Sequence, residues 1–115
     1  MGIDLYIEDE QIRLTNSYWY NEFLNWVAQM IEGDVDFPNI LEHSPNHGQY
    51  LLDKEEPPTM YSGSVQNLKK ELQLLLTYKP PEYAKDIIDE LLRACGMSIK
   101  EKEKITMDGG AFFGD

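Results

Sequence analysis

Alternating apolar and polar residues predict two β-strands at the start of the chain. In IDLYI (residues 3–7), and again in QIRLT (residues 11–15), every second side chain is apolar. A period of two is typical of a strand with one buried face. The polar segment Glu8-Asp9-Glu10 separates the two runs, so we expect a β-hairpin, although the segment lacks the Asn-Gly or Asp-Gly pair of the most secure hairpin turns.

A helical period replaces the alternation after Asn16 and Ser17, either of which can cap a helix by accepting a free backbone N–H. Over residues 18–31 the large apolar residues share one face, which predicts an amphipathic helix of about four turns that ends at Gly33. Side chains at this spacing suit a helix that docks on a sheet, so we interpret the aromatic stripe as core rather than as a ligand cleft. The predicted core residues of this helix are Trp19, Phe23, Trp26, Val27 and Met30.

Two further helices are predicted in the second half of the chain. Ser64 is a good N-cap for residues 65–78, whose apolar side chains form one stripe. The segment Lys79-Pro80-Pro81 ends that helix and starts the next, residues 82–95, because proline cannot continue a helix but fits its first turn. We expect Gly96 to terminate the second helix and the pair to form an antiparallel hairpin.

The connecting segments are shorter or less regular. Pro38 can begin a short helix at residues 38–43, and GQYLL predicts a short strand inside a long loop, residues 44–64, of a length typical of functional loops. Residues 98–108 fit either a solvated helix or an exposed strand, with Ile105 and Met107 favouring a strand at the end.

These elements predict one α+β domain over residues 1–115. An N-terminal β-hairpin in a small antiparallel sheet packs against three main helices, and the last two helices form a hairpin. Residues 109–115 are expected to form a flexible tail, in which Phe112 and Phe113 either tuck into the core or make a contact.

Charge narrows the classes of partner. The net charge is −11, and residues 1–64 hold 12 acidic and 2 basic side chains, against 9 and 8 in residues 65–115. The absence of a basic patch argues against direct nucleic-acid binding, whereas a basic protein partner is favoured. A surface that is acidic only for solubility is the alternative.

Composition also indicates the compartment. The single cysteine, Cys95, cannot form an internal disulfide, which fits a reducing environment. No stretch approaches the ~20 apolar residues of a membrane helix, and the first residues lack the features of a signal peptide. We therefore expect a cytoplasmic protein that makes no membrane contact.

Two histidines in HSPNHGQY raise the question of a metal site. His43 and His47 are four residues apart, but Pro45 lies between them, so they belong to a turn rather than to one helix face. A turn could still bring both around a metal with Glu42 or Asp53 as a third ligand. We expect ordinary loop residues and keep the metal site as the alternative.

Catalytic patterns are weak elsewhere. Cys95 falls on the buried stripe of a helix, where an apolar setting raises the thiol pKa, and Ser64 has an ordinary capping role. The glycines of DGGAFFG precede no helix that could bind a phosphate. We therefore expect no catalysis and no cofactor.

Acidic loop positions remain as candidates for partner binding. They belong to segments that should be exposed, and if they cluster they form a negative patch, with two tyrosines beside the long loop as aromatic anchors. A dispersed, solvated surface is the alternative. The predicted partner-binding residues are Glu8, Asp9, Glu10, Glu32, Asp34, Asp36, Tyr50, Asp53, Glu55, Glu56 and Tyr61.

Three segments resemble small acidic bacterial immunity proteins, which neutralise toxins of contact-dependent or polymorphic toxin systems. They are GIDLYI, FPNILEH, and YSGSVQNLKKELQLL with its pattern of Leu68, Glu71 and Leu72, and together they cover most of residues 2–76. The resemblance implies a protein without catalysis of its own that binds one toxin domain and blocks its active site. It assigns no binding residue.

Two function classes follow. The first is a non-catalytic protein that inhibits a basic toxin or effector through an acidic surface. The second is a small metal-dependent enzyme or metal-binding protein that uses His43 and His47. In a third, residual role as a homo-oligomeric scaffold, Phe112 and Phe113 would be self-association contacts.

Overall fold

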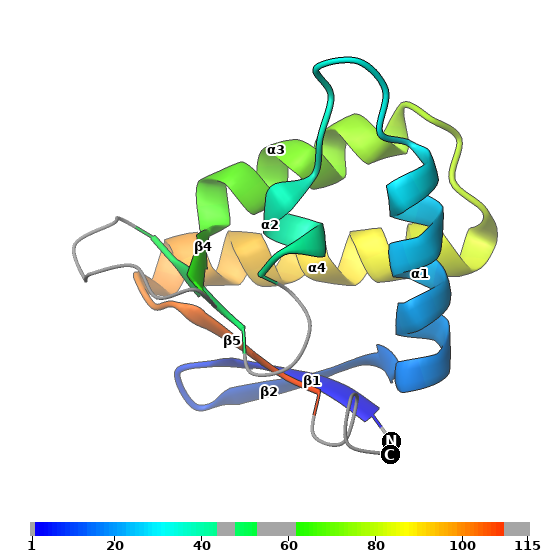
Figure 1. The fold of residues 1–115 in the computed structure, drawn as a ribbon. Coiled ribbons are helices and arrows are strands. Elements are labelled where there is room, and N and C mark those ends of the chain that lie inside the picture. Colours follow the sequence, from blue (N-terminus) through cyan, green and yellow to red (C-terminus); the bar gives the residue numbers. More distant parts are fainter. Residues whose placement is uncertain (1, 44–47, 53–61, 110–115) are drawn as a thin grey trace.

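A five-stranded sheet forms one side of the molecule in the computed structural model, which describes residues 2–43, 48–52 and 62–109 (Figure 1). The strand order is β2-β1-β5-β3-β4, and every neighbouring pair is antiparallel except β3 and β4, which are parallel. The C-terminal strand β5 therefore lies between the N-terminal hairpin and the strands from the middle of the chain. The strands are β1 (Gly2–Ile7), β2 (Glu10–Asn16), β3 (Gln49–Leu51), β4 (Ser62–Ser64) and β5 (Ile105–Asp108).

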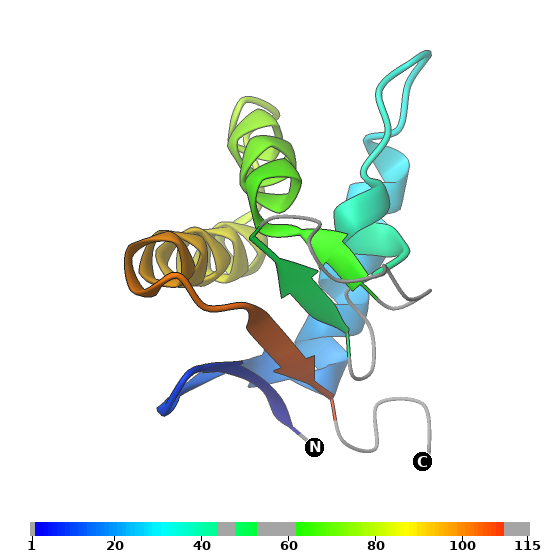
Figure 2. The same ribbon diagram turned by 90° about the vertical axis from the view of Figure 1, so that its left-hand side faces the viewer.

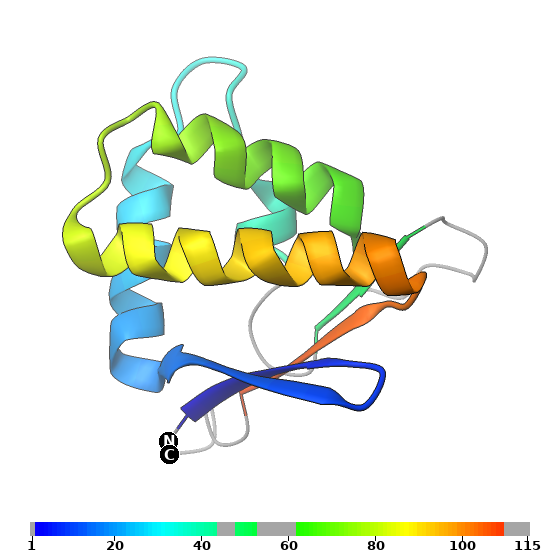
Figure 3. The same cartoon turned by 180° about the vertical axis from the view of Figure 1, so that it is seen from behind.

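Within the described ranges, four helices cover one face of this sheet (Figure 2). The longest, α4, lies between α3 and strands β1, β2 and β5, and it runs antiparallel to α3 (Figure 3). The predicted α+β arrangement, with its N-terminal hairpin and its helical hairpin, is thus confirmed. The helices are α1 (Ser17–Gln29), α2 (Pro38–Leu41), α3 (Val65–Leu76) and α4 (Glu82–Glu101). Over the described ranges, none of them has the length and apolar character needed to cross a bilayer.

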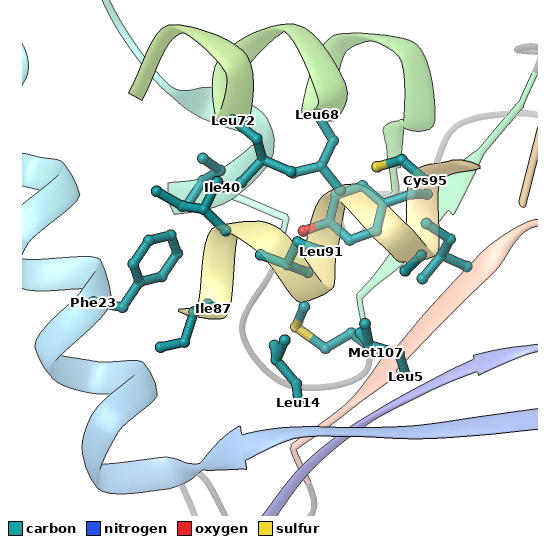
Figure 4. Packing of buried hydrophobic residues seen from close by; sticks show 14 of the residues in the cluster. Leu5, Leu14, Phe23, Ile40, Leu68, Leu72, Ile87, Leu91, Cys95 and Met107 are labelled. Atoms are coloured by element: carbon teal, nitrogen blue, oxygen red, sulfur yellow. The ribbon is translucent and has the colours of Figure 1, made fainter. Parts of the chain in front are cut away.

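One apolar core joins the sheet to all four helices (Figure 4). The alternation expected of β1 is present, since Ile3, Leu5 and Ile7 point into the core and the residues between them are half-buried. Ser64 caps α3 as expected, because its hydroxyl accepts the Asn67 N–H at 3.3 Å. Core residues that span the layers are Leu5, Leu14 and Met107 from the sheet and Phe23, Ile40, Leu68, Leu72, Ile87, Leu91 and Cys95 from the helices.

Helix α1 differs from the prediction in its end and in its buried face. The Asn16 side chain caps it by accepting the Trp19 N–H at 2.8 Å, but the helix ends at Gln29 rather than at Gly33, which sits at φ +60° in a tight turn. The buried face is Tyr20, Phe23 and Val27, whereas Trp19 is 41% exposed. Assigning Trp19 to the core was wrong, because the helix is rotated so that its neighbour Tyr20 enters the core instead.

Helix α4 runs through Gly96 and ends at Glu101, so the predicted stop at Gly96 was also wrong. The buried stripe continues past the glycine to Ser98, whose hydroxyl donates to the backbone carbonyl of Glu103. Lys102, directly after the helix, caps it in the left-handed conformation at φ 57°, and the Glu103 N–H donates to the Ser98 carbonyl at 3.1 Å. Residues 98–108 are therefore helical in their first part and form β5 in their last part.

Strand β4 was not predicted, and the proposed tail lies largely outside the described residues. Ser62-Gly63-Ser64 has none of the β-branched or aromatic residues typical of strands, yet it pairs with β3. Phe112 and Phe113 belong to residues 110–115, for which the structure describes nothing.

Candidate functional site

The segment from α1 to α2 is acidic throughout. Residues 17–43 contain no lysine or arginine, whereas α3, α4 and their connections contain both signs of charge. Figure 2 shows α1, α2 and the loop between them on one side of the molecule, and α3 and α4 on the other. The charge imbalance of the sequence thus becomes a spatial one. The carboxylates of this acidic segment are Glu22, Glu32, Asp34, Asp36 and Glu42.

The acidic segment is not neutralised by ion pairs within the described part of the chain. Arg13 binds Asp4 at 2.6 Å, Lys85 binds Asp89 at 2.9 Å, and Arg93 binds Glu90 at 3.0 Å. These ion pairs connect β1 with β2 or lie within α4, so they leave the acidic segment with its full negative charge.

The two described groups of predicted acidic residues lie apart. Glu8, Asp9 and Glu10 are exposed at the turn of the β1–β2 hairpin, while the α1–α2 loop lies at the opposite end of the molecule (Figures 1 and 3). The structure does not bring them into one patch. The third predicted group, Asp53, Glu55 and Glu56 with Tyr61, lies outside the described residues.

Within the α1–α2 loop the acidic side chains are not equivalent. Glu32, Asp34 and Asp36 are all exposed, but the Asp36 carboxylate accepts the Phe37 N–H at 2.7 Å and so stabilises the entry to α2. The backbone of Glu32 pairs with that of Val35 to close the turn at Gly33, and the side chains of Glu32 and Asp34 are exposed and make no ion pair with the described residues.

Tyr50 is not a surface anchor. It is fully buried, and its hydroxyl donates to the backbone carbonyl of Asn39 at 2.9 Å. The period of two along β3 directs this side chain toward the helices, where its ring is removed from water and its hydroxyl has a partner. The prediction that Tyr50 lies at an interface was therefore wrong.

An aromatic cluster, defined as the exposed Tyr18 and Trp19 and the half-buried Tyr83, joins the first turns of α1 and α4. The ring centroids of Tyr18 and Trp19 are 5.1 Å apart, and those of Trp19 and Tyr83 are 5.0 Å apart. Tyr18 is 63% exposed. The one signal in the sequence was the run of three consecutive aromatic residues at 18–20, because one helix cannot bury all three on the same face.

Glu22 lies beside this cluster. The Tyr83 hydroxyl donates to the backbone carbonyl of Glu22 at 3.4 Å, a long hydrogen bond that ties α4 to α1. The pKa of Tyr83 is raised, first by burial and then by the negative charge of Glu22. Glu22 also follows Trp19 by three residues and Tyr18 by four on α1, so its side chain shares their face of the helix.

A buried polar network joins two of the segments named for their family resemblance. The Glu71 carboxylate on α3 accepts the backbone N–H of Asn39 at 3.1 Å, the Asn39 side-chain amide at 2.6 Å and the Ile40 N–H at 3.1 Å. These backbone donors belong to the first turn of α2, which has no side-chain cap of its own, so α3 caps α2. The pKa of Glu71 is nevertheless raised, because burial outweighs the three hydrogen bonds.

Asn39 extends this network to the sheet. Its side-chain oxygen accepts the Ser64 N–H at 2.9 Å, which links α2 to the end of β4. A β-carbon added to Gly63 would lie 2.7 Å from the same oxygen and 3.0 Å from the Tyr50 ring, so only glycine fits there without displacement. FPNILEH and the described part of YSGSV, residues 62–65, therefore meet in the fold, and these contacts are structural.

The candidate metal and nucleophile positions stay weak. His43 is half-buried, its Nδ1 has no hydrogen-bond partner among the described residues, and His47 lies outside them. Across residues 2–43, 48–52 and 62–109 there is no group of three or more His, Cys, Asp or Glu side chains arranged to hold a metal ion. Cys95 is fully buried, and burial raises its thiol pKa to about 12, as expected of a core cysteine.

Comparison with protein-family models, with curated protein sequences and with solved structures gave no match.

Proposed function

We propose that the protein is a non-catalytic binding protein that inhibits a basic toxin or effector protein through its acidic surface. The observation that supports this most directly is the acidic segment, residues 17–43, which has five carboxylates, no lysine or arginine and no ion pair within the described part of the chain. A surface of one sign raises the encounter rate with a partner of opposite charge and suppresses wrong partners.

The size of the acidic segment also suits a protein partner. Helix α1 has 13 residues and is therefore about 20 Å long, with the aromatic cluster at its start and the α1–α2 loop just beyond its end. A standard interface buries about 800 Å² on each partner, a patch roughly 30 Å across. One partner can thus contact both ends of α1, and inhibition would follow if that partner's active site lies under the contact.

The test is affinity capture from the source cells, with quantification of the captured proteins by mass spectrometry. The wild type is compared with Glu32→Lys/Asp34→Lys and with the matched charge reversal Glu101→Lys/Glu103→Lys near the end of α4. Asp36 is left unchanged because its carboxylate also stabilises the backbone at Phe37.

The proposal predicts that one basic protein is captured in near-equal amount by the wild type and by the Glu101→Lys/Glu103→Lys control, and is lost with Glu32→Lys/Asp34→Lys. Higher salt should weaken its capture, since screening shortens the range of the attraction. The captured protein is then purified, and its activity should fall on addition of the wild type. Equal loss with both double variants would remove the acidic segment from the binding site, and a partner whose activity is unchanged would refute inhibition.

A further inference from the structure

Contacts between α1 and α4 account for Tyr83 and for one side of Trp19, but they do not account for the exposure of Tyr18 and Trp19. Large exposed apolar residues are usually dispersed, whereas Tyr18 and Trp19 are neighbours in contact and Tyr83 joins them from another helix. Tryptophan and tyrosine at such positions are typical of the few residues that dominate the energy of an interface. The cluster is also preorganised, because Trp19 packs on Tyr83 and Tyr83 is tethered to the backbone of Glu22.

The charge around the cluster indicates what it binds. The first turns of α1 and α4 meet here, and each helix start contributes about half a positive charge. Glu22 and Glu82 contribute a full negative charge each, and Lys85, the nearest lysine on α4, is already paired with Asp89. Glu22, which has no ion pair within the described residues, therefore places a negative charge beside the rings, and an aromatic face beside a negative charge attracts a cation.

We infer that the aromatic cluster, with Glu22, binds an arginine side chain of the basic partner, the guanidinium lying over the exposed indole of Trp19. Arginine fits better than lysine, because its planar, weakly hydrated guanidinium stacks on an aromatic ring while its N–H groups bind a carboxylate. This inference rests on the proposed function, for which it names the chemical group recognised at the start of α1.

The inference is tested with a defined probe, so that the natural partner is not needed. A ten-residue peptide of alternating glycine and arginine spans about 33 Å when extended, which is enough to reach from the aromatic cluster to the α1–α2 loop. Matched peptides replace arginine with lysine or with citrulline, the neutral analogue of the same shape. Dissociation constants are measured from the NMR shifts of the indole N–H groups of Trp19 and Trp26, and from the backbone amides in variants that lack Trp19.

The decisive variants form a series at one position. Trp19→Phe keeps an aromatic ring with a weaker attraction for cations, and Trp19→Leu keeps an apolar side chain with none. Ile99→Ala, at an apolar position on α4 that is 40% exposed, is the matched control. Thermal unfolding of each variant confirms that it folds. If Trp19→Leu does not fold, Trp19→Phe alone tests the inference.

We expect the arginine peptide to bind the wild type and the Ile99→Ala control with equal affinity. It should bind Trp19→Phe more weakly, and its affinity for Trp19→Leu should be about two- to fivefold lower than for the wild type. The lysine peptide should bind more weakly than the arginine peptide, and the citrulline peptide should not shift the Trp19 signal. Wild-type affinity in Trp19→Leu, or equal binding of the citrulline peptide, would overturn the inference.

The same peptides separate this inference from the proposed function. If Glu32→Lys/Asp34→Lys weakens the binding of both cationic peptides while Trp19→Leu binds like the wild type, the acidic surface stands and the arginine site falls. If neither Glu32→Lys/Asp34→Lys nor Trp19→Leu weakens peptide binding, both the acidic surface and the arginine site are refuted.

Discussion

The link between α2, α3 and the sheet predicts a large cost for a single truncation, Asn39→Ala. Asn39 is 8% exposed, and its side chain makes two hydrogen bonds, one to the Glu71 carboxylate and one from the Ser64 N–H. The substitution removes both and leaves the Ser64 donor buried without its partner. The rest of α2 can keep its backbone hydrogen bonds to Glu71.

The magnitude follows from these two losses. A hydrogen bond to a charged group contributes about 1.5–3 kcal/mol, and a buried donor left unsatisfied costs about 1–3 kcal/mol. Together they predict a loss of about 2.5–6 kcal/mol in the free energy of unfolding. This is a large fraction of the roughly 5–15 kcal/mol that stabilises a typical domain.

Urea unfolding, followed by circular dichroism, measures this loss. With an m-value of about 2 kcal/mol/M, the midpoint should fall by about 2 M while the slope stays constant. Asn25→Ala, at an exposed position of α1, is the control and should change stability by less than about 0.5 kcal/mol. A double-mutant cycle with Glu71→Ala should give a coupling of about 1–2 kcal/mol. If Asn39→Ala were as mild as the control, or additive with Glu71→Ala, the network would not stabilise the fold as argued.

Three more predictions follow from local features. The pKa of Glu71 is raised above its ordinary value of 4.5, so the stability that this shift contributes is fully present below pH 4.5 and is lost as the pH rises through the folded-state pKa. In parallel urea titrations, the wild type should therefore lose stability relative to Glu71→Gln between pH 4 and pH 7. A difference in stability that stays constant over this range would contradict the prediction. Lys102→Gly should raise the stability of the protein by about 0.5–1 kcal/mol, because glycine adopts the left-handed conformation without strain. Lys100→Gly, inside α4, should lower the stability by about 1 kcal/mol. Thermal melts compare the two variants, and a loss of stability in both would show that Lys102 is not strained. The Cys95 thiol should react with a thiol reagent at neutral pH only after denaturant is added, and rapid labelling of the native protein would show that the helix packing opens.

The parts of the fold that were predicted from the sequence are those with a strong local period. Strands β1 and β2 alternate, and α3 has an apolar stripe and a capping serine at its start, so their positions follow from near neighbours. The errors fall where distant contacts decide. Strand β4 is held by pairing with β3 and by the contact of Asn39 with Ser64, neither of which leaves a trace in the Ser-Gly-Ser sequence. Gly96 did not end α4 because the buried stripe continues on both sides of it, and packing outweighs the low helix propensity of one glycine.

The candidate site, like the fold, was predicted where the signal is local and missed where distant contacts decide. The excess of acidic residues in the first half of the chain was evident from composition, but its separation into a hairpin end and an α1–α2 end depends on the direction of α1 relative to the sheet. The exposure of Trp19 depends on a rotation of α1 by about one residue, which periodicity cannot resolve when three aromatic residues are consecutive. The hydrogen-bonding role of Glu71 depends on α2, more than 30 residues earlier in the chain.

The central place of β5 also shapes how the chain can fold during synthesis. Strands β1 and β3 have no hydrogen bonds to each other and meet only through β5, whose residues 105–108 are made long after both. Until then, the nascent protein presents two open sheet edges, each able to pair with another chain. The synthesis of β5 therefore closes the sheet, and a ribosome that stalls within α4 would leave a product prone to aggregation rather than a smaller folded domain.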